Sequence, residues 1–361
     1  MKNTKKKVNK KKRTTKKKNN KKIIILFAVI DVLAFSCFFT FYGPISSFRT
    51  FLVTTAMTTK SHKYLAKTFY SQKYIDKILA SNSIVSFSSG SDATQIVIGG
   101  TDTDSYASIY EKEILEHNKD EDYKLIRFEY NGYDCFIVAI YDPTRVSLAQ
   151  SKYIGVEGQS LTDMSRSYDA KVMINAGGFD DVDMYGNVGQ GSGGKPMGIV
   201  IKDGKLVSGN GNFNTEIAGF NNDGILQLSY TTANEAINNG IRDAVQFGPF
   251  LVVNGISATI NGNGGWGINP RTVLAQRKDG IVLFLVVDGN GVNSYNWSGR
   301  GGATMEDLIV ILERYGAYNA VNMDGGASTT LVINNELVNH PCGTNPQRQY
   351  QRRLPNAWMF K

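Results

Sequence analysis

Residues 123–141 read YKLIRFEYNGYDCFIVAIY, two apolar-rich runs joined by Asn131-Gly132. Asn-Gly accepts the positive φ angles of a tight hairpin turn whose twist matches two antiparallel strands. The flanking runs are rich in Tyr, Phe, Ile and Val, which favour strands. This stretch therefore predicts a β-hairpin, and it marks the start of a folded domain.

The same pattern recurs along the rest of the chain. Turn signals between apolar runs occur at Asp203-Gly204, Asn222-Asp223-Gly224, Lys278-Asp279-Gly280 and Asn334-Asn335. Three short helices are expected over residues 161–168, 233–239 and 305–315, the last with Thr304 as its N-cap. Residues 123–361 are therefore expected to form one α+β domain, built mostly from antiparallel hairpins with a few packed helices.

The N-terminal segment has a different composition. Residues 1–22 carry thirteen Lys or Arg and no acid, so the net charge of +8 belongs to a tail and not to a nucleic-acid-binding face. Residues 23–42 carry one formal charge, Asp31, and are long enough to cross a bilayer as a helix. The preceding lysines predict a single-pass anchor in the cell membrane, with the N-terminus in the cytoplasm and the domain outside. A cleavable signal peptide is the competing interpretation.

Residues 43–122 are expected to connect the anchor to the domain. Apolar residues recur at helical spacing over residues 45–80, which predicts a stalk, a self-association helix or a helix on the outer membrane surface. Residues 81–122 are rich in Ser, Asp, Thr and Gly and predict a polar linker with little regular structure. Outside the span, Cys135 and Cys342 are the only cysteines, and they either pair or stay as buried thiols. The spacing fixes neither a disulfide nor an oligomeric state.

Polar, Gly-rich clusters follow four of the predicted strands. They begin at Asn175, Gly248, Asp288 and Asp324. Glycines let backbone N–H groups approach a ligand closely, while carboxylates and hydroxyls transfer protons and form hydrogen bonds. If the strand ends converge, they bring two carboxylates, an amide and many bare N–H groups to one pocket. Taken singly, each cluster is also an ordinary turn signal.

Six motifs, in order, resemble those of the phosphodiester glycosidase family over about residues 125–360. They are INAGGF (174–179), GPF (248–250), PRT (270–272), VDG (287–289), TMEDL (304–308) and NMDGGAST (322–329). The last run is the most specific of them. The anchor and the stalk also resemble those of membrane-tethered bacterial members. One departure is Gly178, which stands where the family usually has an aromatic residue.

The resemblance implies hydrolysis of a sugar-1-phosphodiester at the anomeric carbon, on cell-surface or exopolysaccharide-type glycans. In this reaction Asp324 is the expected nucleophile or general base, and Asp288 is the second carboxylate. Arg271 is expected to hold the phosphate through its guanidinium group. The other expected substrate-binding residues are Asn175, Gly177, Gly325, Gly326, Ser328 and Thr329.

Two alternatives stay open at this point. The same Gly-rich, hydroxyl-rich pocket would serve a non-catalytic module that binds or assembles a phosphate-containing envelope polysaccharide. No cofactor is expected, although Asp288, Asp324 and nearby carbonyls are hard oxygen ligands suited to calcium. The presence of only three histidines argues against a multi-His zinc site and against a Ser-His-Asp triad.

Overall fold

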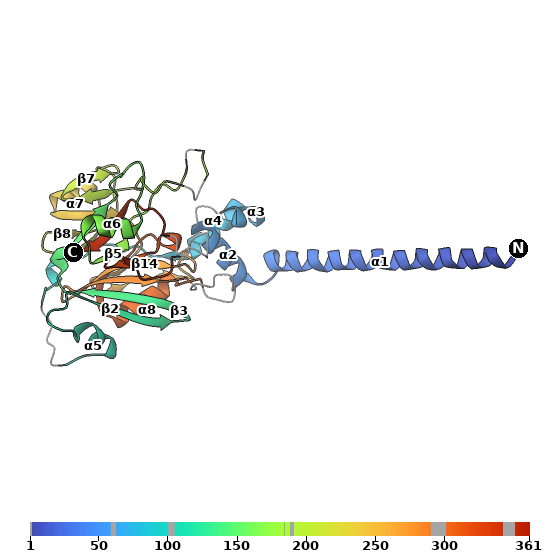
Figure 1. Ribbon diagram of the computed structural model, residues 1–361, viewed down its shortest axis with the longest axis horizontal. Coiled ribbons are helices and arrows are strands. Elements are labelled where there is room, and N and C mark those ends of the chain that lie inside the picture. Colours follow the sequence, from blue (N-terminus) through green and yellow to red (C-terminus); the bar gives the residue numbers. More distant parts are fainter. Residues whose placement is uncertain are drawn as a thin grey trace.

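The computed structural model describes residues 2–58, 63–99, 105–183, 185–187, 191–289, 301–341 and 351–361, with only the helical backbone over residues 2–20. Cys342 lies outside these ranges. The predicted choice between a Cys135–Cys342 disulfide and two buried thiols therefore lies outside the described residues. A long helix, α1 (Lys2–Tyr42), leads into a body of sheets and short helices that also holds the C-terminus (Figure 1).

The largest sheet has seven antiparallel strands and contains the predicted hairpin. In spatial order the strands are β12 (Ile256–Ser257), β11 (Phe250–Val253), β16 (Ala317–Asn322), β14 (Arg271–Arg277), β15 (Val282–Val287), β3 (Tyr133–Ile140) and β2 (Tyr123–Tyr130). Strand β15 is buried along its whole length, and its side chains alternate between two apolar clusters, one on each face of the sheet. The centre of this sheet is therefore covered on both sides.

Two five-stranded antiparallel sheets complete the body. One contains β18 (Glu336–Leu337), β17 (Leu331–Ile333), β5 (Val172–Asn175), β19 (Asn356–Phe360) and β4 (Val146–Gln150). The other contains β7 (Lys205–Ser208), β6 (Val200–Lys202), β10 (Ile241–Gln246), β8 (Thr215–Asn221) and β9 (Leu226–Thr231). Side chains of all three sheets, including Phe284, Trp358 and Phe220, meet in one central core. The predicted α+β fold of antiparallel hairpins is confirmed.

Short helices cover the outer faces of the sheets. Helix α8 (Met305–Arg314) and helix α5 (Ile109–Leu115) pack on the seven-stranded sheet, α6 (Leu161–Tyr168) packs beside β5, and α7 (Ala233–Asn238) packs against β10. Three single 3₁₀ turns are η1 (Ala93–Gln95), η2 (Pro143–Arg145) and η3 (Gly326–Ser328). As predicted, Thr304 caps α8: its side chain accepts from the Asp307 N–H, and the Asp307 carboxylate accepts from the Thr304 N–H.

All five predicted hairpins are present. The predicted turns lie between β2 and β3, β6 and β7, β8 and β9, β14 and β15, and β17 and β18. At the first turn Asn131 and Gly132 both have positive φ, as the Asn-Gly signal requires. The predicted helices over residues 233–239 and 305–315 each end one residue earlier than expected.

The segment between the long helix and β2 is more ordered than the sequence predicted. Helices α2 (Ser46–Thr58), α3 (Lys63–Phe69) and α4 (Gln72–Ser81) form a small helical cluster with its own apolar core. The prediction of an irregular linker over residues 81–122 is wrong in two places. There, β1 (Ser83–Ile84) pairs with β13 (Ile260–Asn261), and α5 packs on the seven-stranded sheet. Within the described part of this segment, β1 and α5 therefore pack against the sheets and loops that follow in the chain.

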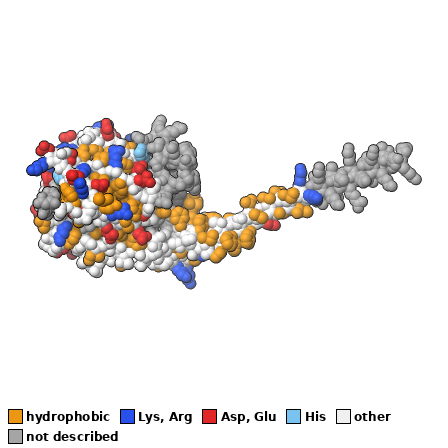
Figure 2. Space-filling view, turned by 90° about the horizontal axis from the view of Figure 1, so that it is seen from below, with side chains coloured by type: hydrophobic (Ala, Val, Ile, Leu, Met, Phe, Trp, Pro, Cys, Tyr) orange, Lys and Arg blue, Asp and Glu red, His pale blue; other side chains and the backbone are white. Residues whose placement is uncertain are grey.

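One helical stretch among the described residues, Lys21–Tyr42, is long and apolar enough to cross a membrane. None of its most apolar window is buried inside the protein, and Figure 2 shows apolar side chains covering it up to the body. A signal sequence passes the same test of length and composition, so the stretch stays a candidate span.

Replacing Leu285 with Ala is expected to lower the free energy of unfolding by about 2–5 kcal/mol, because this β15 side chain is fully buried under α8. Leu206→Ala on the exposed edge strand β7 is the matched control, with an expected loss below about 1 kcal/mol. Urea unfolding of the full chain in detergent measures both losses. Equal losses would contradict the central position of β15.

Candidate active site

The predicted polar clusters converge where strands of the seven-stranded sheet and strand β5 of the β4–β19–β5 sheet end. Because β14 runs antiparallel to β15, its first residue Arg271 pairs with Val287, the residue before Asp288. Strand β5 ends at the same place, where the Asn175 amide nitrogen donates a 2.6 Å hydrogen bond to the backbone oxygen of Asp324. Strand register therefore brings together residues that are far apart in the sequence.

Arg271 carries a buried positive charge at this edge. Its Nε donates to the backbone oxygen of Ala303 (3.2 Å), and its Nη2 donates to those of Trp266 (2.7 Å) and Gly267 (2.9 Å). Burial lowers the pKa of the guanidinium to about 10, so the group stays charged at neutral pH. Within the described part of the chain, no carboxylate forms an ion pair with it. Its Nη1 faces Gly325, 3.8 Å from where a Cβ would stand.

The turn after β16 places Gly325 beside this guanidinium, directly after Asp324. Asp324 is partly exposed, and its N–H donates to the backbone oxygen of Ala176 (3.1 Å). The next residue must be glycine, because a Cβ on Gly325 would lie 2.8 Å from the backbone oxygen of Pro270. Gly326 has a φ of +62° and donates its N–H to the same Pro270 oxygen (2.9 Å). Gly326 was expected to bind substrate, but its N–H already has a partner in the protein.

Asn175 holds three segments of the site together. Its side-chain oxygen accepts from the Thr272 hydroxyl (2.6 Å) and the Thr330 N–H (3.1 Å), while its nitrogen holds Asp324. The N–H of Gly177, two residues on, is likewise used inside the protein. The contacts of these two predicted substrate-binding residues are those of a framework that supports the site.

Two hydroxyls of the 322–329 run remain available. The Ser328 and Thr329 side chains are buried, and neither hydroxyl has a hydrogen-bond partner among the described residues. A buried hydroxyl without a partner is costly, so these groups favour a ligand or water beside them. They are the side chains of this run that agree best with the predicted binding role.

Asp288 is more deeply buried than the sequence suggested. One carboxylate oxygen accepts from the Asn339 side-chain nitrogen and the other from the His340 N–H, both at 2.7 Å. Burial raises the pKa of this carboxyl, and the two donors oppose that rise. Asn339 also donates to the backbone oxygen of Thr329 (3.1 Å). Asp288 thus fastens the 339–340 loop behind the site, and both of its oxygens are occupied.

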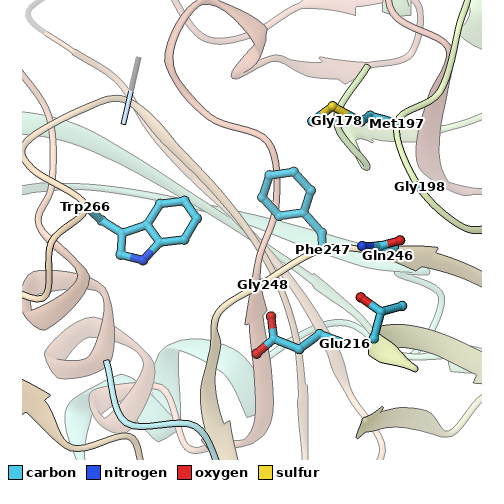
Figure 3. A pocket seen from close by; sticks show the side chains of 9 residues that line it. Gly178, Met197, Gly198, Glu216, Gln246, Phe247, Gly248 and Trp266 are labelled. Atoms are coloured by element: carbon cyan, nitrogen blue, oxygen red, sulfur yellow. The ribbon is translucent and has the colours of Figure 1, made fainter. Parts of the chain in front are cut away.

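A cavity of about 320 Å³ opens next to these residues. Its lining comprises Gly178, Met197, Gly198, Thr215, Glu216, Gln246, Phe247, Gly248 and Trp266. Figure 3 shows the Glu216 carboxylate beneath Gly248, with the Phe247 ring above it and the Trp266 ring to the left. The cavity and the Arg271 edge share walls: the Trp266 carbonyl binds Arg271, and the Gly248 carbonyl accepts from the Asn322 side chain (3.0 Å).

Comparison with known proteins agrees with this arrangement. Residues 168–361, more than half of the chain, match the family model for phosphodiester glycosidase. The chain belongs to the phosphodiester glycosidase family. The matched region holds Asn175, Arg271, Asp288 and Asp324 together with the cavity.

Several relatives share parts of the chain. It is 27% identical over 209 residues to the SPbeta prophage-derived protein YomE of Bacillus subtilis, covering 55% of this chain and 29% of that protein. It is 24% identical over 166 residues to N-acetylglucosamine-1-phosphodiester alpha-N-acetylglucosaminidase of Mus musculus, covering 41% and 31%. The chain thus spans about a third of the length of the curated relatives it matches.

A solved structure shows the same fold. The zebrafish N-acetylglucosamine-1-phosphodiester alpha-N-acetylglucosaminidase catalytic domain, auto-inhibited by its pro-peptide, aligns with a TM-score of 0.53 at 20% identity. The alignment covers 68% of this chain and 85% of that one. At 20% identity, this similarity shows a shared fold but does not show a shared substrate.

The cavity explains the departure of this chain at Gly178. A Cβ at this position would lie 3.2 Å from the Phe247 ring, so Phe247 occupies the space beside the glycine backbone. A larger side chain at position 178 would have to displace that ring. In this member of the phosphodiester glycosidase family, Phe247 therefore fills the space beside position 178, and Trp266 is the other aromatic residue that lines the pocket.

Sequence reasoning missed Glu216, the carboxyl group that lines the cavity. It lies on β8, and burial raises its pKa. A Cβ on Gly248 would clash with its carboxylate, so the glycine of the GPF motif makes room for it. The glycine of the GPF motif indicates that another group comes close to the backbone at position 248. It does not identify that group as Glu216, because the pairing of β8 with β10 is not visible in the sequence.

Among the described residues, no group of three or more His, Cys, Asp or Glu side chains is placed to hold a metal ion. The calcium alternative would therefore depend on Asp288 and Asp324 with carbonyl oxygens. Asp288 is buried, and its carboxylate oxygens accept hydrogen bonds from Asn339 and His340, so these contacts give it a structural role.

Asn175→Ala is expected to lower the free energy of unfolding by about 1–3 kcal/mol or more, because it leaves buried donors at Thr272 and Thr330 without their acceptor. Asn118→Ala, at an exposed asparagine whose side-chain nitrogen donates to nearby Glu121, is the control. Thermal unfolding of both variants measures the difference. If the Asn175→Ala variant has wild-type stability and only a raised KM, the structural role would be contradicted and Asn175 would bind substrate.

Proposed function

We propose that the chain hydrolyses sugar-1-phosphodiesters of glycans outside the cell membrane, at the cell surface or in exopolysaccharide. The observation that carries this proposal is the buried charge of Arg271, which has three carbonyl partners and no carboxylate partner among the described residues. A buried cation is strongly destabilising unless an anion or a set of dipoles compensates it. A phosphate beside the Asp324–Gly325 turn would supply the missing negative charge.

The reaction adds water across the bond between the anomeric carbon and the phosphate oxygen. That bond breaks, the sugar leaves with a hydroxyl at C1, and the phosphate leaves as a monoester. Arg271 with the hydroxyls of Ser328 and Thr329 would hold the phosphate and stabilise its developing charge. Asp324, which is partly exposed and directly precedes Gly325, would act as nucleophile or general base.

The sugar would occupy the cavity next to the phosphate position. Trp266 and Phe247 offer apolar ring surfaces, and Glu216 is the carboxyl group that lines it. Burial favours the protonated form of Glu216, so this residue would donate a proton to the departing phosphate oxygen. In this proposal Glu216 takes the place of Asp288 as the second carboxylate, because both oxygens of Asp288 are already bonded.

Asp324→Asn is expected to reduce sugar release by at least about 10²–10⁴-fold, with unchanged thermal unfolding, because the amide can act neither as base nor as nucleophile. The measurement is product formation by the full chain in detergent from UDP-sugars and p-nitrophenyl sugar-1-phosphodiesters. Asp120→Asn, at an exposed position, serves as control. No release from any substrate, with envelope polysaccharide bound equally by wild type and variant, would contradict hydrolysis and favour the non-catalytic binding module.

The pH profile tests Glu216 separately. A group that donates its proton works below its pKa, so activity is expected to fall as the pH rises through the raised pKa of Glu216. In the Glu216→Gln variant, this fall of activity at high pH is expected to disappear. Its kcat is expected to be about 10²-fold lower than that of the wild type. Glu129→Gln, at an exposed position, should keep the wild-type profile. An unchanged fall of activity at high pH in the Glu216 variant would remove this residue from the proton transfer.

A further inference from the structure

The helical cluster of α2–α4 is fastened to the end of the candidate membrane span. The Tyr70 hydroxyl donates to the backbone oxygen of Phe41 (2.9 Å), and the Tyr42 hydroxyl donates to that of Phe69 (2.8 Å). The rings of Phe41 and Phe69 stack with their centroids 3.8 Å apart. These contacts join the outer end of α1 to the cluster at several points, which restricts how the body turns relative to the span.

On another side, the same cluster packs against the loop of residues 261–269. The Asn263 side chain donates to the Thr54 hydroxyl on α2 (2.9 Å). Gly267 has a φ of +61°, and a Cβ there would lie 2.8 Å from the Thr55 hydroxyl oxygen. The loop backbone therefore contacts α2 as closely as a residue without a side chain allows.

This loop is also a wall of the candidate active site. Trp266 lines the cavity, and the carbonyls of Trp266 and Gly267 hold the Arg271 guanidinium. Thr55 lies nine residues after Ser46, the start of α2, which is roughly 14 Å along a helix. A continuous series of contacts thus runs from the end of the span to the pocket over a short distance. Figure 1 shows α2 and α4 between the long helix and the sheets.

The surface of the cluster suits an anionic membrane. Six basic residues and one acid fall between positions 43 and 82, whereas acids outnumber bases in the rest of the outer chain. Lys63 and Lys67 on α3 are exposed one helical turn apart, and the apolar side chains of Ile45 and Phe51 are also exposed. Lysines next to a span are attracted to anionic lipid headgroups, and aromatic residues favour the membrane–water interface.

We propose that this cluster lies on the outer membrane surface and that the pocket takes sugar-1-phosphodiesters whose aglycone is a long-chain alcohol held in the same membrane. The proposal rests on the hydrolysis proposed above. Water adds at the anomeric carbon, the C1–O bond to phosphate breaks, and the sugar is released into solution. The lipid keeps the phosphate as a monoester, and the remaining proton of water goes to that monoester or to solvent.

The test uses the full chain reconstituted in phosphatidylglycerol-containing vesicles. Two substrates carry the same sugar-1-phosphodiester, one with a soluble short-chain alcohol and one with a long-chain alcohol in the same vesicles. The expected result is at least a tenfold higher kcat/KM for the long-chain substrate. A double charge reversal, Lys63→Glu with Lys67→Glu, is expected to reduce that preference at least threefold and to leave hydrolysis of the soluble substrate unchanged. Lys119→Glu with Lys205→Glu, at exposed positions away from the cluster, should keep the preference.

The outcomes separate this proposal from the general one. Hydrolysis of both substrates at equal kcat/KM, or a preference that both double variants keep in full, would overturn the membrane-borne substrate while hydrolysis itself stands. Hydrolysis of neither substrate would overturn both proposals. A preference that only the Lys63 and Lys67 variant loses would support the membrane-facing site.

Discussion

The site depends on one constraint, the compensation of the buried Arg271 charge. Three backbone carbonyls hold the guanidinium, and two of them belong to the 261–269 loop. Carbonyl dipoles offset part of the cost of burying this charge without neutralising it, and the proposed function assigns the remaining compensation to the phosphate of the substrate. Gly325 and the Trp266 carbonyl lie next to this group, and the loop that carries Trp266 packs against α2.

Strand register is what turns separate turn signals into one site. Antiparallel pairing sets the start of β14 beside the end of β15, and Asn175 then fastens β5 to the turn that carries Asp324. Much of the polar chemistry in the motifs therefore supports the framework. Asp288 and Asn175 use their polar side-chain atoms in hydrogen bonds within the protein, whereas the buried hydroxyls of Ser328 and Thr329 have no hydrogen-bond partner among the described residues.

The sequence was most informative where local chemistry decides local structure. Turns such as Asn131-Gly132 and the Thr304 cap were predictable, because they depend on residues next to each other in the chain. Helix α5 was missed because seven residues capped by Ser108 carry too little periodicity. Glu216 was missed for another reason. Its position in the pocket depends on the pairing of β8 with β10 and on the space that Gly248 leaves. Neither feature can be recognised from residues that are adjacent in the sequence.

The most direct measurement is a crystal structure of the Asp324→Asn variant with an uncleaved sugar-1-phosphodiester bound. The proposed function predicts the phosphate within hydrogen-bond distance of Arg271 Nη1 and near the Ser328 and Thr329 hydroxyls, with the sugar against Trp266 and Glu216. A phosphate bound elsewhere, with the Arg271 guanidinium still contacting only its three carbonyls, would contradict the proposal that this buried charge is the phosphate site.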